Sequence, residues 1–166
     1  MARKDIRHVS ETPATAWLRR HGIAFSEHVY DYVEHGGTAE SAQQLDVDEY
    51  AVVKTLVMQD ERARPLLVLM HGDRQVSTKN LARAIGCKSV GPCSAEVAQR
   101  HSGYQIGGTS PFGFKREGVP VYVQASVLAL PRICINGGRR GFLVGIPSAV
   151  LTEVLGAQPV ECAVPN

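Results

Sequence analysis

The order of hydrophobic and polar residues along the chain predicts a mixture of short helices and strands. Apolar positions at helical spacing, opened by Thr, Ser or Pro and in most cases closed by glycine, predict helices at residues 12–22, 38–47, 77–86, 94–103 and 147–156. Runs rich in β-branched residues predict strands at residues 23–32, 51–59, 65–71, 121–124, 132–136 and 141–146. The elements do not follow a strict strand–helix–strand rhythm, so the sequence predicts an α+β fold in one compact domain.

Local signals sharpen two parts of this pattern. The strands at 51–59 and 65–71 are joined by the charged segment DERAR, which predicts a hairpin. Thr12, Thr38, Ser77 and Ser94 stand where helix N-caps are expected, because their hydroxyl groups can accept a hydrogen bond from a free backbone N–H.

The strand at 51–59 carries a lysine at its centre. In an extended strand Val52, Lys54 and Leu56 share one face. Either this face meets solvent at a sheet edge, or Lys54 points into a cleft where its charge has a partner. An unpaired ammonium group in an apolar site would cost several kcal/mol, roughly. A buried Lys54 would therefore need an anionic or strongly polar ligand.

Two glycine-rich segments interrupt the regular pattern. Residues 103–120, GYQIGGTSPFGFKREGVP, hold too many glycines and prolines for a regular element and predict a shaped loop. The glycines of GGTSPFG let a ligand approach the backbone, where consecutive amides can form a nest for an oxyanion or a phosphate. NGGRRG at residues 136–141 indicates a second cradle or a tight hairpin turn with solvated arginines, and it lacks the Gly-Lys-Ser/Thr ending of a P-loop.

Conventional nucleophiles and metal ligands are not evident. Ser110 precedes a proline, and Phe112 stands where a G-x-S-x-G nucleophile elbow needs its second glycine. The four cysteines form no CxxC pair, and the six histidines show no H-E-x-x-H spacing. We expect reduced thiols and neither a metal ion nor a cofactor.

Composition limits the class of protein. With 166 residues, 44% hydrophobic and 20% charged, the chain is expected to be globular, with a flexible leader at residues 1–11 and one domain at residues 12–166. No apolar run approaches the ~20 residues of a membrane helix, and the polar start lacks the apolar core of a secretory signal. We therefore expect a cytoplasmic protein without a membrane partner.

The net charge of +2 permits a nucleic-acid partner without requiring one. Basic side chains that surround one cleft could hold a polyphosphate backbone, in which case affinity would fall steeply with salt. The candidates for this role are Lys79, Lys115, Arg116, Arg139 and Arg140.

Taken together and in order, several segments resemble the YbaK/EbsC family of aminoacyl-tRNA deacylases. They are the opening TPATAWLRRHGIAFSEHVYDY, then VVKTL, LARAIGCKSV, AQRHSGYQIGGTSPFG and INGGRRG. The resemblance extends to VLGAQ near the C-terminus and so covers nearly the whole chain. It implies a compact fold in which a mixed, barrel-like β-sheet is flanked by helices.

The resemblance also implies an activity. Family members hydrolyse amino acids wrongly attached to tRNA, usually in trans beside prolyl-tRNA synthetase, and the best-known branch removes cysteine from proline tRNA. It implies that Lys54 and Gly108 are catalytic. It further implies a substrate pocket formed by Tyr30, Thr55, Gly107, Thr109, Ser110, Asn136 and Gly138, with the acceptor end of tRNA held by the basic side chains named above.

The implied chemistry needs little from the protein. An aminoacyl ester is already activated, so the site need only position it and stabilise the oxyanion, for instance with amides near Gly108. A lysine with its ordinary pKa near ~10.4 is a poor base at pH 7, which favours an electrostatic role for Lys54. In the cysteine-specific branch the substrate's own thiol is thought to attack the ester.

Two positions depart from the cysteine-specific pattern. Asn136 stands where the family usually has serine, and Leu143 stands where an aspartate is common. Alanine or another small amino acid therefore remains an alternative substrate. Two further alternatives are a non-catalytic module of the same fold that binds an aminoacyl-tRNA end, a nucleotide or a partner protein, and a metal-free esterase of small molecules.

Overall fold

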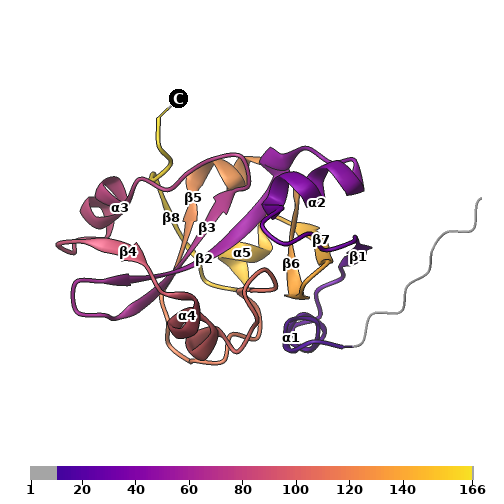
Figure 1. Ribbon diagram of the computed structural model, residues 1–166, viewed down its shortest axis with the longest axis horizontal. Coiled ribbons are helices and arrows are strands. Elements are labelled where there is room, and N and C mark those ends of the chain that lie inside the picture. Colours follow the sequence, from indigo (N-terminus) through magenta and orange to yellow (C-terminus); the bar gives the residue numbers. More distant parts are fainter. Residues whose placement is uncertain (1–10, 166) are drawn as a thin grey trace, which may run out of the picture.

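The computed structural model describes residues 11–165, which form one bent, mixed β-sheet with short helices around it (Figure 1). The strands are β1 (Ser26–Val29), β2 (Val52–Asp60), β3 (Pro65–His71), β4 (Val90–Pro92), β5 (Val121–Gln124), β6 (Arg132–Arg139), β7 (Phe142–Pro147) and β8 (Gln158–Val160). The α-helices are α1 (Pro13–Arg20), α2 (Gly37–Leu45), α3 (Thr78–Ile85), α4 (Ala95–Ser102) and α5 (Val150–Glu153), and the 3-10 helices are η1 (Glu49–Ala51) and η2 (Ala125–Ala129). The expected α+β domain is confirmed, whereas residues 1–10 of the expected leader lie outside the described residues.

The strand order is β1-β7-β6-β2-β3-β5-β8, and β4 pairs with β2 beside this path. The expected hairpin is present, since β2 and β3 pair antiparallel from Val53 opposite His71 to Gln59 opposite Pro65. Its turn is fixed by Asp60, whose carboxylate accepts hydrogen bonds from the backbone N–H groups of Arg62 and Arg64. Parallel pairs join β2 to β6, β3 to β5 and β5 to β8, so the sheet is mixed.

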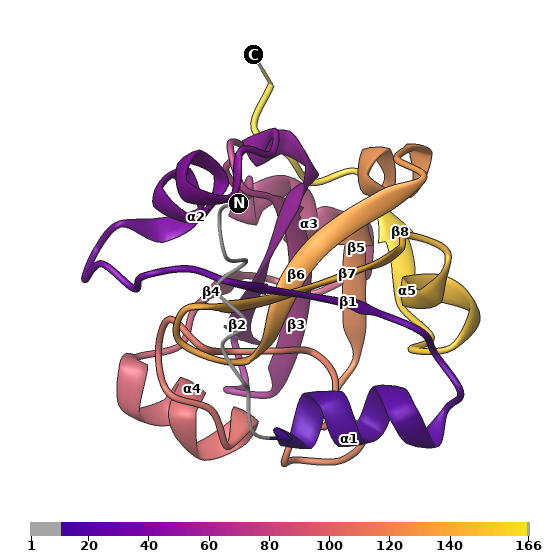
Figure 2. The same ribbon diagram turned by 90° about the vertical axis from the view of Figure 1, so that its right-hand side faces the viewer.

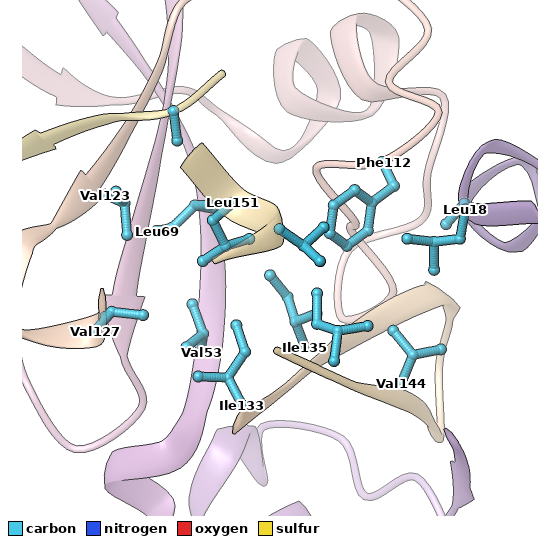
Figure 3. Packing of buried hydrophobic residues seen from close by; sticks show 14 of the residues in the cluster. Leu18, Val53, Leu69, Phe112, Val123, Val127, Ile133, Ile135, Val144 and Leu151 are labelled. Atoms are coloured by element: carbon cyan, nitrogen blue, oxygen red, sulfur yellow. The ribbon is translucent and has the colours of Figure 1, made fainter. Parts of the chain in front are cut away.

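The sheet bends around the main hydrophobic core. In Figure 2, β1 and β7 run across the direction of β3 and β5, so the two halves of the sheet face one another. Figure 3 shows Leu69 and Val123 from one half and Ile135 and Val144 from the other half in the same interior. All four side chains are 0% exposed. This bend of the open sheet accounts for the barrel-like shape that the family resemblance implied.

The expected caps at three helices are confirmed. Thr12 accepts a hydrogen bond from Thr15 N–H at the start of α1, within a complete capping box. Ser77 and Ser94 cap α3 and α4 in the same way, by accepting from the N–H three residues on. Both of these helices end at a glycine with positive φ, which is the conformation that glycine adopts without strain.

Several expected boundaries are wrong. Thr38 does not cap α2, which begins at Gly37 after Gly36, because its hydroxyl is engaged with Glu49 and the Gly72 carbonyl. The last helix is shorter than predicted, since Pro147 ends β7 and the helix spans only Val150–Glu153. The first strand is confined to Ser26–Val29. Strands β4 and β8 were not predicted, because three residues are too few to show a period.

Candidate active site

The sheet has a gap along one edge of β2. On the edge away from β3, β2 pairs with β6 only at Val52 and Val53, and with β4 only from Met58 onward. Peptide groups alternate along a strand, so Thr55 presents its N–H and C=O to the same edge as Val53 and Val57. The Val57 carbonyl accepts a hydrogen bond from Cys93 N–H at 3.1 Å, whereas Thr55 lies in the stretch that no other described strand pairs with.

A cavity of about 480 Å³ occupies this gap. Every residue of β2 from Val52 to Met58 lines it, so both faces of the open stretch contribute. The remaining wall comes from segments distant in sequence, namely residues 30–41, 92–98, 106–109, 136 and 143. The size is typical of a pocket for a small molecule or for the end of a larger one.

Lys54 points into the cavity and is half-buried. Its ammonium group makes one long hydrogen bond, 3.4 Å from Nζ to the Gly72 carbonyl oxygen. Burial lowers the pKa of Lys54, while the negative charges of Glu49 and Asp73 act in the opposite direction. Of the two possibilities left open by the sequence, the structure supports the charged cleft.

Thr55, opposite Leu69 in the hairpin, contributes unpaired polar groups to the same cavity. Its hydroxyl oxygen is buried and has no hydrogen-bond partner within the part of the chain that the structure describes. An unsatisfied buried hydroxyl costs about 1–3 kcal/mol, which a ligand can recover. Lys54 and Thr55 therefore place a cation and unsatisfied polar groups on neighbouring residues.

Asn136 ties the turn between β6 and β7 to the glycine loop. Its side-chain carbonyl oxygen accepts from the N–H groups of Gly138 (2.7 Å) and Arg139 (3.2 Å), and its amide donates to the Gly107 carbonyl (3.2 Å). The predicted turn at NGGRRG is thus present. It serves as the anchor of the 106–109 wall of the cavity.

Gly108 lies where this loop touches the turn. A Cβ atom at Gly108 would lie 2.8 Å from Arg140 N and 2.9 Å from Arg139 C, so only glycine fits against this backbone. The Gly108 N–H donates to the Gln105 carbonyl at 2.8 Å. Its amide is therefore already engaged, whereas the N–H groups of Gly107 and Thr109 make no hydrogen bond within residues 11–165.

Two tyrosines from the segment after β1 close the cavity. The Tyr30 N–H donates to the Gly141 carbonyl at 2.9 Å, which fixes this segment on the turn after β6. Burial raises the pKa of Tyr30. Tyr32 packs on Gly107, and the Arg140 guanidinium carbon lies 4.7 Å from the centre of its ring.

The structure gathers six of the nine predicted catalytic and substrate-binding residues around one cavity. These are Tyr30, Lys54, Thr55, Gly107, Thr109 and Asn136. The other three support the wall from outside. Gly108 packs on the Arg139–Arg140 backbone, Ser110 is fully buried and accepts from Phe112 N–H, and Gly138 packs on Thr12 and Tyr104.

The basic residues predicted to bind tRNA do not form one ring. Arg139 and Arg140 are exposed on the turn that anchors the cavity wall. Lys115 and Arg116 are exposed farther along the loop, where their N–H groups bond to the end of α4. Lys79 is exposed on α3, which contributes no residue to the cavity wall.

Sequence reasoning missed several residues of the wall, namely Tyr32, Thr38, Cys93 and Ile106. Tyr32 lies two residues after Tyr30 and shared its segment, which was the available signal. Cys93 follows a strand too short to recognise, and burial raises the pKa of its thiol. A raised pKa keeps this thiol protonated and disfavours it as a nucleophile.

The described residues contain neither a cluster suited to a metal ion nor a helix suited to a membrane. Within residues 11–165, no group of three or more His, Cys, Asp or Glu side chains could hold a metal ion. No helix in the same part of the chain is long and apolar enough to cross a membrane.

Comparisons with known proteins agree with this geometry. A family model described as "Aminoacyl-tRNA editing domain" matches residues 34–154, which include β2 and the walls contributed by the glycine loop and the β6–β7 turn. The candidate Cys-tRNA(Pro)/Cys-tRNA(Cys) deacylase EbsC of Enterococcus faecalis is 28% identical over 154 residues, covering 92% of each chain.

Two further comparisons are with a much longer protein and with a chain that this one covers completely. A proline–tRNA ligase of Limosilactobacillus reuteri is 29% identical over 107 residues. The match covers 62% of this chain but only 18% of the ligase. The crystal structure of a candidate trans-editing enzyme for prolyl tRNA synthetase superimposes with a TM-score of 0.80 at 21% identity, covering 95% of this chain and 100% of that one. At this identity the superposition establishes the fold.

Proposed function

Because the chain belongs to the aminoacyl-tRNA editing domain family, we propose that it is a trans-editing hydrolase that removes cysteine from mischarged proline tRNA. One observation carries the proposal. Lys54, a cation, and Thr55, whose buried hydroxyl has no hydrogen-bond partner among the described residues, both line one cavity at the open edge of β2. A site of this kind is suited to an ester whose oxygens become negative as it reacts.

In this mechanism the cavity positions the 3′-terminal aminoacyl ester of the tRNA. Lys54, in its protonated form, binds the ester or phosphate oxygens and stabilises the oxyanion. The free amides of Gly107 and Thr109 are the donors that the glycine loop offers, since the Gly108 amide is engaged with Gln105. Positioning and charge stabilisation are sufficient, because the ester is already activated.

Two routes lead to free tRNA. In hydrolysis, water adds to the ester carbonyl, the carbon–oxygen bond to the ribose breaks, and the proton lost by water ends on the ribose oxygen. With a cysteinyl substrate, its own thiol can form the new carbon–sulfur bond instead, which releases a cyclic thioester and leaves the thiol proton on the ribose oxygen. The second route needs no protein nucleophile.

The relatives support this choice of substrate and partner. EbsC is named for Cys-tRNA(Pro) and Cys-tRNA(Cys), and other relatives are prolyl-tRNA ligases. We propose mischarged tRNA as the substrate and prolyl-tRNA synthetase as the partner, in the cytoplasm. Asn136 and the buried Leu143 both line the cavity, so the two departures from the cysteine-specific pattern fall where they can alter specificity towards alanine.

The test is a deacylation panel with cysteinyl-tRNA(Pro), alanyl-tRNA(Pro) and correctly charged prolyl-tRNA(Pro). The wild type is expected to release cysteine fastest, and Lys54→Ala is expected to lose at least about a hundredfold in kcat/KM. Lys88→Ala, which removes an exposed lysine outside the cavity, is the matched control.

The outcomes separate the competing functions. Faster release of alanine than of cysteine would replace the substrate but keep the activity. Tight tRNA binding without release above the buffer rate would favour a binding module. Equal activity of the wild type and Lys54→Ala would overturn the role given to Lys54.

A further inference from the structure

We propose that Thr38, Glu49 and the Gly72 carbonyl form a positioning device that holds the Lys54 ammonium group at the cavity, charged but free to bind substrate. The device deepens the proposed function and rests on it for its purpose. Its geometry can be tested on the protein without tRNA. None of its three members was singled out by the sequence for this role.

The Gly72 peptide provides the fixed point. Its N–H donates to the Val52 carbonyl at 2.7 Å, which continues the β2–β3 ladder by one residue. A Cβ atom at this position would lie 2.6 Å from Thr38 Oγ1 and 2.8 Å from Val52 O. Only glycine allows this approach, and it leaves the Gly72 carbonyl 3.4 Å from Lys54 Nζ and 3.1 Å from Thr38 Oγ1.

Thr38 lies between this carbonyl and a carboxylate, and its hydroxyl links α2 to Glu49. Its Oγ1 lies 2.7 Å from Glu49 Oε2 and 3.1 Å from the Gly72 oxygen. A hydroxyl has a single hydrogen, and the shorter contact to a charged acceptor is the stronger one. Donation to Glu49 therefore leaves the Gly72 carbonyl to the Lys54 ammonium group.

Glu49 is held close to Lys54 without pairing with it. Among the described residues, no Lys, Arg or His nitrogen lies within 4.0 Å of the Glu49 carboxylate. A direct ion pair would mask the ammonium group and compete with an anionic substrate. A carboxylate fixed by Thr38 instead supplies negative potential from outside the cavity lining and leaves Lys54 without a paired anion there.

The electrostatic surroundings of Lys54 are simple. The described side chains that line the cavity include no carboxylate, so the negative charges that act on Lys54 come from Glu49 and Asp73, outside the lining. Both oppose the lowering of the Lys54 pKa by burial. The other titratable groups that line the cavity are Tyr30, Tyr32, His35 and Cys93.

A purely structural reading is that Thr38 and Glu49 only tie α2 to η1. The two readings differ in what happens to Lys54 when the charge is removed and the bond is kept. Glu49→Gln retains a side-chain oxygen that can accept from Thr38, but it removes the negative charge. Thr38→Val keeps the size of the side chain and removes the link.

The decisive measurement is the pKa of the Lys54 amine, followed by NMR of isotope-labelled lysine in the wild type and in Glu49→Gln without tRNA. We expect Glu49→Gln to lower this pKa by roughly half a unit or more. The alkaline limb of the kcat/KM profile for deacylation should move to lower pH by the same amount. Thr38→Val is expected to lower kcat by about threefold to tenfold, because the ammonium group is less well placed.

Glu153→Gln on α5, an exposed carboxylate outside the cavity wall, is the matched control and should leave the Lys54 pKa unchanged. An unchanged pKa in Glu49→Gln would overturn the proposal, even if the variant were less stable. Failure of the wild type to deacylate any tRNA would instead overturn the proposed function, while the NMR titration would still decide whether the device exists.

Discussion

Strands β2 and β3 are partners in one hairpin, yet they differ in burial and in the pairing of their edges. β3 is buried along its whole length, and both of its edges are paired, with β2 on one side and β5 on the other. β2 is only partly buried, and one edge is open between β6 and β4. Opposite residues show the contrast, since Leu69 packs in the core while Thr55 keeps an unpaired hydroxyl.

The difference shows how a small sheet can hold both a core and a site. A fully paired strand offers no free backbone group, so its contribution is to stability. Where pairing along one edge is interrupted, a strand exposes its peptide groups and both of its faces. Here the interruption lies between two strands that both use the same edge of β2, and the candidate site occupies it.

The largest expected effect is on the free energy of unfolding and comes from a substitution in β3. Leu69→Ala removes a fully buried side chain from the main core and should lower the free energy of unfolding by about 2–5 kcal/mol. Deacylation per folded molecule should change little at low temperature. Urea unfolding combined with activity measured on the folded fraction checks both statements, and a Leu69→Ala protein of wild-type stability would contradict the contrast.

An intermediate effect is expected at Gly108, which does not line the cavity but belongs to the loop that does. Gly108→Ala forces a methyl group against the Arg139–Arg140 backbone, which should cost about 1–3 kcal/mol and displace the loop. Activity should fall by more than tenfold. Gly91→Ala on β4 is the control, because a Cβ atom there meets nothing within 4 Å. Equal losses in both variants would show that the close approach at Gly108 is not what shapes the cavity.

The smallest effect is a gain in stability at Lys54. Because burial lowers the Lys54 pKa below its ordinary 10.5, the unfolded chain binds more protons between these two values. Stability of the wild type therefore rises with pH through that window. Lys54→Met should be slightly more stable than the wild type below the lowered pKa, and this gain should vanish above pH 10.5.

Urea unfolding at several pH values below and above 10.5 measures this difference, with Lys88→Met as the exposed control. A pH-independent gain would show that added apolar packing, and not the removal of a buried charge, is responsible. Deacylation should be lost in Lys54→Met at every pH.

Most of the fold was predictable because local signals agree with it. The hairpin follows from two apolar runs around a charged turn, and Ser77 and Ser94 are caps because no other described group bonds to their hydroxyl groups. Thr38 shows the limit of such signals. Its hydroxyl bonds to Glu49, 11 residues away, and no local pattern contains that contact.

The residues of the candidate site were easier to predict than their arrangement in space. Lys54 could be solvated or enclosed until β4 and β6 were placed around β2, and neither pairing can be derived from periodicity. Amides near Gly108 were expected to act as donors, but the sequence could not show that the Gly108 N–H itself is engaged with the Gln105 carbonyl. The stretch of β2 whose edge away from β3 has no partner among the described strands is a property of the assembled sheet alone.

The parallel pairing of β2 with β6 has a consequence for the order of folding. It joins Val52 to Cys134, 82 residues apart, and the cavity needs both the segment near Tyr30 and Leu143. Closing such long loops is slow compared with forming the local β2–β3 hairpin. We therefore expect the core hairpin to form early and the cavity to be completed only when β6 and β7 dock, so that a nascent chain gains its site only after Leu143 has been made.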